Sequence, residues 1–168
     1  IDGRLQVVAK EKGDLLSAAG GIYSSVADMS KWVMMHLHKG AYGAGLEKRL
    51  FSERVHDEMW RPQTLVPLRN PGPYNSHFSA YGLGWRLSDV KGFLQANHTG
   101  GLMGMVTQVT ILPELDLGII VFTNQQEEAA FSAIANTIKD FYFGIKSVDR
   151  VKELSERRDQ QFAEAARA

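Results

Sequence analysis

The stretch "FLQANHTGGLMGMVTQVTILPELDLGIIVFTN" at residues 93–124 decides the fold, because it holds three strand patterns in close succession. Residues 93–100 form the first pattern, and residues 105–112 form the second, with the two-residue period of a strand. Residues 117–124 are apolar enough for a strand that is buried on both faces. The connections between them are too short to hold a crossover helix, so these strands should be antiparallel neighbours.

A fourth strand is predicted just before this stretch. The sequence "YGLGWRL" at residues 81–87 has strand character, and "SDVKG" at residues 88–92 predicts the turn that joins it to the next strand. Residues 61–80 contain four of the five prolines of the chain, which indicates a loop over the surface.

Helical patterns lie on both sides of the strands in the sequence. Ser25 is a good N-cap for a helix that stops before Gly40, and a shorter helix is predicted from Ser52 to Trp60. A third helix follows "NQQEE" and ends at Gly144. Its apolar stripe should lie across the sheet, and it consists of Ala130, Phe131, Ile134, Ile138, Phe141 and Tyr142.

This order of elements predicts an α+β fold, with an antiparallel sheet of about four strands flanked by helices. We expect residues 1–145 to belong to one domain. Residues 146–168 are rich in charge and alanine, which is typical of a solvated helical tail or a linker.

Composition excludes several classes of function. Nineteen basic side chains balance nineteen acidic ones among 168 residues, so nucleic acid is not an expected partner. No apolar run is long enough for a membrane span, and the lack of cysteine excludes disulfides and thiolate metal sites. His36 and His38 would point away from each other on a helix, so we expect a surface or interface role for them and no metal or cofactor.

The segment "NHTGG" at residues 97–101 places an imidazole and a hydroxyl beside two glycines. One interpretation is a strand that ends in a turn, where glycines supply unusual backbone angles. The other interpretation is the wall of an active site, where a backbone N–H must come close to a substrate.

Four segments in this order resemble the serine β-lactamase-like family, which includes class C β-lactamases, penicillin-binding DD-peptidases, D-aminopeptidases and related esterases. The segments are "AAGGIYSSVADMSKWV", "YGLGW", "NHTGGLMGM" and "LDLGIIVFTN". The resemblance implies the C-terminal portion of the β-lactamase/transpeptidase-like fold. It also implies that His98, Thr99 and Gly100 bind substrate, and that the N–H of Gly101 is an oxyanion-hole donor. No metal is implied.

The nucleophile of that family belongs to a Ser-x-x-Lys motif at the start of a helix. The only such spacing here joins Ser88 and Lys91 in a predicted hairpin turn, where the lysine amine does not lie over the serine hydroxyl. The resemblance therefore implies a fragment of a serine acyl hydrolase whose nucleophile lies upstream, and which is inactive alone. Its expected partners are a small-molecule or peptide acyl substrate and the missing N-terminal half of the same domain.

Two alternatives stay open at this point. The chain is either the catalytic relative or a non-catalytic binding module that keeps the sheet and the cleft. A homo-oligomer is a further alternative, because faces left exposed by a missing half would drive association. The family resemblance implies a periplasmic or secreted protein, and the sequence does not distinguish β-lactam, D-amino-acid peptide and ester substrates.

Overall fold

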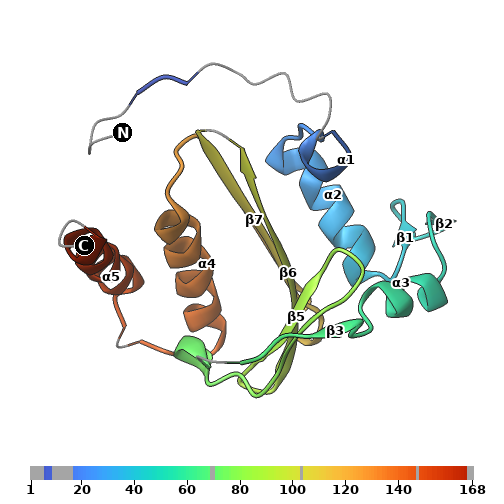
Figure 1. Ribbon diagram of the computed structural model, residues 1–168. Coiled ribbons are helices and arrows are strands. Elements are labelled where there is room, and N and C mark those ends of the chain that lie inside the picture. The colour runs from blue at the N-terminus through green and yellow to red at the C-terminus, as the bar shows by residue number, and fades with distance from the viewer. Residues whose placement is uncertain (1–5, 9–16, 69–70, 103, 147, 166–168) are drawn as a thin grey trace. The chain divides into compact units, whose positions relative to one another are not determined.

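The computed structural model of the chain contains a six-stranded sheet with the order β3-β4-β5-β6-β7-β8 (Figure 1). The model describes residues 6–8, 17–68, 71–102, 104–146 and 148–165. The strands follow one another in chain order, and the sheet is antiparallel. Their bounds are Thr64–Leu65 (β3), Ser79–Tyr81 (β4), Arg86–Val90 (β5), Phe93–Leu102 (β6), Met105–Leu112 (β7) and Leu117–Thr123 (β8). The predicted α+β class is confirmed.

The chain forms two compact units, each made from separate segments of sequence. The first unit consists of residues 1–23, 100–107 and 121–168, and the second of residues 24–99 and 108–120. Strands β6, β7 and β8 contribute residues to both.

The helices of the second unit begin close to where the sequence predicts, each after a serine N-cap, of which Ser25 was the predicted one. Helix α2 (Val26–Leu37) follows Ser25, whose hydroxyl oxygen accepts a hydrogen bond from the backbone N–H of Asp28 at 3.1 Å. Helix α3 (Glu53–Met59) follows Ser52, which caps the N–H of Val55 in the same way. Each cap satisfies an N–H that would otherwise lack a helical partner. A small hairpin of β1 (Ala41–Tyr42) and β2 (Lys48–Arg49) lies between them.

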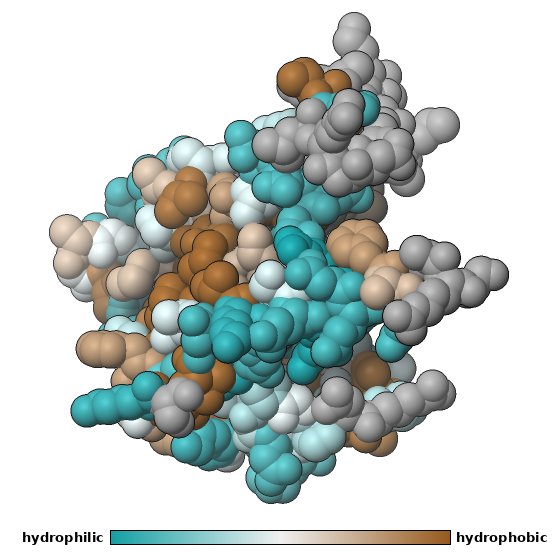
Figure 2. Space-filling model, turned by 90° about the vertical axis from the view of Figure 1, so that its left-hand side faces the viewer, coloured by the Kyte–Doolittle hydropathy of each residue, from teal (hydrophilic) through white to brown (hydrophobic). Residues whose placement is uncertain are grey.

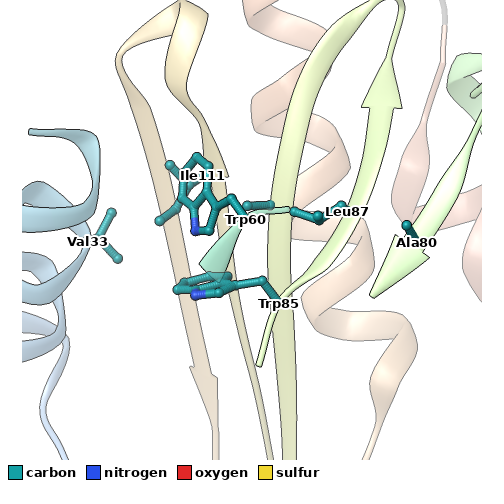
Figure 3. Close-up of a cluster of buried hydrophobic side chains, with 7 residues drawn as sticks. Val33, Trp60, Ala80, Trp85, Leu87 and Ile111 are labelled. Carbon is teal, nitrogen blue, oxygen red and sulfur yellow. The ribbon is translucent and has the colours of Figure 1, made fainter. Parts of the chain in front are cut away.

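The core of the second unit lies between α2 and one face of the sheet (Figure 3). Its buried members come from α2, from the segment after α3 and from β4 to β7, and are Val33, Trp60, Ala80, Trp85, Leu87, Ala96 and Ile111. Helix α2 approaches the sheet closely at Gly118 of β8, where an added Cβ atom would collide with Val33. Glycine at this position therefore sets the spacing between helix and sheet.

The connections within residues 88–116 are as tight as predicted or tighter. The turn between β5 and β6 is formed by Lys91 and Gly92, which both have positive φ, at 52° and 88°. That is the signature of a two-residue hairpin turn whose twist matches the strands. The predicted turn at residues 88–92 was too long, since Ser88 to Val90 belong to β5. The "PELD" reversal forms a short 3₁₀ turn, Pro113–Leu115, as predicted.

The sheet has two strands more than the expected four. Strand β3 and all but the last residue of β4 lie in residues 61–80, which were predicted to be a surface loop. Strand β3 has two residues and β4 has three, so neither is long enough to show a strand period in the sequence. They are recognisable only from their pairing, in which Thr64 and Leu65 lie opposite Tyr81 and Ala80.

The first unit contains α1 (Ser17–Gly20), α4 (Glu128–Tyr142) and α5 (Arg150–Ala165), with α5 packed against α4. The apolar stripe predicted for α4 is only partly buried. Phe131 is buried, whereas Ile134, Phe141 and Tyr142 are exposed. Asp140 is buried instead, because it pairs with Arg150 of α5. Burial on α4 thus follows the contact with α5 as well as hydrophobicity.

Surface hydropathy is mixed on the face seen in Figure 2, where hydrophobic side chains lie among hydrophilic ones. None of the described helices combines the length and the hydropathy needed to cross a membrane. Strand β8 was expected to be buried on both faces. Leu117, Ile119 and Val121 are buried on one face, and on the other face Ile120 is partly buried against the core and Gly118 lies close to Val33.

Candidate active site

The residues predicted to bind substrate lie together at one end of β6. Strand β6 pairs with β5 from Phe93 to Asn97, and Asn97 lies opposite Arg86, the first residue of β5. From His98 to Leu102 the strand continues beyond β5. Among the described strands, nothing pairs with this part of β6 on the β5 side. Its backbone is therefore available to an added strand or an extended ligand on that side.

Strand geometry explains why His98 leaves the core. Successive side chains point to opposite faces, so His98 shares a face with Leu94 and Ala96. Ala96 is completely buried in the core, and Leu94 is partly buried against it. His98, further along the same face, is exposed. The imidazole therefore stands where the core face of the sheet reaches solvent.

The His98 ring has a specific partner. Its Nε2 lies 2.9 Å from the hydroxyl oxygen of Tyr81, the last residue of β4. The two ring centroids are 6.2 Å apart and the ring planes meet at 68°, an edge-on arrangement. The hydrogen bond orients the imidazole, and Thr99 follows it on the exposed part of the strand.

Gly100 and Gly101 differ in the space that surrounds each of them. A Cβ atom on Gly100 would lie 2.6 Å from the hydroxyl oxygen of Thr107, so a side chain there has no room. A Cβ atom on Gly101 would meet nothing within 4 Å among the described residues. Gly101 also lacks a positive φ. Among the described residues, neither packing nor backbone conformation requires a glycine at residue 101, and its position leaves space open beside β6.

The Ser88-x-x-Lys91 spacing does not form a nucleophile and its base. Ser88 lies on β5, and its hydroxyl accepts a hydrogen bond from the side-chain amide of Gln95 at 3.2 Å. Lys91 lies in the following turn. The two residues are therefore not on one turn of a helix, where a lysine three positions on would lie beside the serine.

A depression of about 590 Å³ lies away from these residues. It is formed by α2 and the β1–β2 hairpin, and Met34, Met35, His38, Tyr42 and Leu46 are among its lining residues. In the described part of the chain, no three histidine or acidic side chains are grouped as a metal site requires.

The expectation that His36 and His38 lie at the surface is wrong for His36. His36 was expected at the surface, but it is only 1% exposed and lies among the rings of Trp32, Phe51, Trp60 and Trp85. His56 of α3 lies beside it, with ring centroids 5.7 Å apart. Burial, and then the nearby His56, lower the pKa of His36 to about 4.

Sequence reasoning missed Tyr81 as a partner of His98. The contact joins residues seventeen apart in sequence and depends on the pairing of β4 with β5 and of β5 with β6. The signal that would have found it is the tyrosine that begins "YGLGW", once β4 is recognised as a strand.

Comparison with known proteins identifies one family that the chain matches and two proteins, named as hydrolases, that are similar to it. A family model described as Beta-lactamase matches residues 2–141. The chain is 27% identical over 146 residues to the Unguisins hydrolase ungD of Aspergillus violaceofuscus, covering 80% of this chain and 25% of that protein. It is 24% identical over 135 residues to the Unguisins hydrolase ungD' of Aspergillus campestris, covering 80% and 23%. The chain thus spans about a quarter of the length of the curated relatives that it matches.

Proposed function

Because the chain belongs to the beta-lactamase family, we propose that it forms the substrate-binding part of a serine acyl hydrolase. The reaction would pass through a covalent acyl-serine, with a nucleophile contributed by sequence outside these 168 residues. The substrate would be a β-lactam, a D-amino-acid peptide or an ester. Two relatives are named as hydrolases, which supports this class of reaction.

The observation that carries the proposal is the open end of β6. Residues 98–101 continue the strand past the start of β5, and the space beside Gly101 is free of described atoms within 4 Å of an added Cβ. An acyl group could therefore lie along this strand with its carbonyl oxygen near the backbone N–H of Gly101. A fixed backbone donor stabilises the negative charge that develops on that oxygen, by about 3 kcal/mol in measured cases.

His98 and Thr99 have the donors that the rest of such a substrate would need. The imidazole of His98 is exposed and held by Tyr81, and the hydroxyl of Thr99 is on the neighbouring position of the strand. Both side chains donate hydrogen bonds to carbonyl or carboxylate oxygens. We assign substrate binding to these two residues and to Gly100, and oxyanion stabilisation to Gly101.

Covalent labelling tests the reaction class. We expect the complete gene product to be labelled by a fluorescent penicillin or by a fluorescent phosphonate, and the 168-residue chain to remain unlabelled. Labelling of the short chain at Ser88 would show that the nucleophile has been assigned wrongly. A complete protein that binds the probe reversibly but is never acylated would favour the non-catalytic binding module.

A substitution at Gly101 tests the oxyanion assignment. Gly101→Val adds a side chain suited to a strand, in space that the described residues leave open. The variant should melt at the same temperature as the wild type but acylate at least tenfold more slowly, because the carbonyl can no longer approach the N–H. Gly45→Val, in an exposed loop without positive φ, is the matched control and should acylate normally. Unchanged acylation of Gly101→Val would refute the assignment.

A further inference from the structure

The hydrogen bond between Tyr81 and His98 reaches across the sheet beyond the beginning of β5. Tyr81 ends β4, and His98 comes directly after Asn97, the last residue of β6 that pairs with β5. The hydroxyl oxygen and Nε2 are 2.9 Å apart, well within the range of a hydrogen bond. Both residues belong to the same compact unit.

Tyr81 is the fixed member of this pair. Its backbone pairs with Thr64 of β3 on one side and with Arg86 of β5 on the other. Its carbonyl oxygen also accepts a hydrogen bond from the N–H of Gln63 at 2.8 Å. The tyrosine side chain is half-buried, whereas His98 is exposed. The phenol therefore orients the imidazole, and not the reverse.

The partner of one ring nitrogen decides what the other nitrogen does. A neutral imidazole carries hydrogen on one nitrogen and a lone pair on the other. A phenol hydroxyl is a good donor and an imidazole nitrogen is a good acceptor, so the hydroxyl of Tyr81 should donate to Nε2 of His98. The hydrogen of the imidazole then lies on Nδ1.

We propose that Tyr81 is a positioning residue, which fixes His98 as a neutral donor through Nδ1–H and thereby selects substrates with an uncharged carbonyl oxygen at this position. The selection rests on the proposed function, because it needs an acyl substrate along β6. A neutral N–H pairs well with the oxygen of an ester or an internal amide. It offers a carboxylate no charge to pair with, so a terminal carboxylate loses its hydration without an ionic partner from His98.

Nitrogen NMR of the histidine side chains tests the tautomer in the 168-residue chain. The signal of His98 is assigned with His98→Gln, and the ring nitrogen shifts report which nitrogen carries hydrogen. We expect hydrogen on Nδ1 in the wild type and a mixture of tautomers in Tyr81→Phe, which keeps the ring but removes the hydroxyl. Tyr42→Phe, the same change at an exposed tyrosine of β1, should leave the His98 signal unchanged.

Two outcomes would overturn the proposal at this stage. One is hydrogen on Nε2 of His98 in the wild type, and the other is an unchanged tautomer in a folded Tyr81→Phe variant. Tryptophan fluorescence checks folding, since Trp85 lies in the turn that follows Tyr81. If Tyr81→Phe does not fold, the wild-type tautomer alone still decides.

Kinetics of the complete gene product test the selection. Two acyl substrates are compared that differ only in a carboxamide or a carboxylate beside the scissile bond. We expect the wild type to prefer the carboxamide in kcat/KM, and Tyr81→Phe to lose about fivefold of that preference, as for one hydrogen bond. Tyr42→Phe should keep it. A protein that is acylated without any preference overturns this inference only, whereas a protein that is never acylated overturns the proposed function and leaves the NMR result standing.

Discussion

Replacing His36 by phenylalanine should protect the protein against mild acid. His36 lies on α2, is 1% exposed, and is enclosed by four aromatic rings whose centroids lie 4.7 to 6.0 Å from that of the imidazole. Both of its ring nitrogens lack a hydrogen-bond partner in the described part of the chain. A charge on this ring would therefore be buried without an anion, so the folded protein keeps the imidazole neutral.

The size of the effect follows from the pKa. Burial lowers the pKa of His36 from 6.5 to about 4, whereas the unfolded chain keeps the ordinary value. Between these two pH values the unfolded state binds more protons, so the free energy of unfolding falls as the pH falls. Each pKa unit is worth about 1.4 kcal/mol, so the loss from pH 6.5 to 4 is about 3 kcal/mol.

Urea denaturation at about pH 7.5 and about pH 4.5 measures this loss. We expect the wild type to lose about 3 kcal/mol more than His36→Phe over that interval. His38→Gln, a change of a less buried histidine next to the end of α2, should behave like the wild type. A smaller loss can remain in His36→Phe, because burial also lowers the pKa of His56. Equal losses in the wild type and His36→Phe would refute the reasoning.

Two further perturbations test the described contacts. Asp89 is buried, which alone would raise its pKa, but hydrogen bonds from the side chain and N–H of His77 and from two other N–H groups lower its pKa to about 2. The stabilising effect of the Asp89 carboxylate should therefore be present above pH 3.8 and disappear as the pH falls towards 2. In urea denaturation at neutral pH, Asp89→Asn should lower the free energy of unfolding by about 2 kcal/mol. A loss near zero would contradict this reasoning. Gly118→Ala should lower the melting temperature because the new Cβ collides with Val33, with a cost of about 1 to 3 kcal/mol, and an unchanged melting temperature would show that α2 moves freely.

The parts of the fold that depend on local sequence were predictable. Ser25 caps its helix as expected, and the shorter helix begins next to Ser52, because capping involves residues three apart. Strands β6 to β8 have enough residues to show their character, and short connections fix their order. Strands β3 and β4 were missed because two or three residues carry no period.

The parts that depend on distant packing were not predictable. The two-residue spacing of His36 and His38 on a helix predicts that they point apart, but it says nothing of what covers each one. His36 is covered by Phe51, His56 and Trp85, which come from later segments of the chain. Similarly, the family resemblance implies a site at residues 98–101, but the partner of His98 depends on the register of three strands.

The turn formed by "YGLGW" determines where β5 begins, and therefore how much of β6 has no partner on the β5 side. The N–H of Gly82 donates to the carbonyl of Trp85 at 2.7 Å, and Gly84 has a φ of 78°, so the chain reverses at once after Tyr81. Gly82 also lies against the carbonyl of Met59, where a side chain has no room. An insertion that let β5 begin earlier would extend its ladder along His98 and Thr99 and occupy the backbone groups that β6 now leaves unpaired on that side. Loop length here therefore sets how much of β6 is left without a partner on the β5 side.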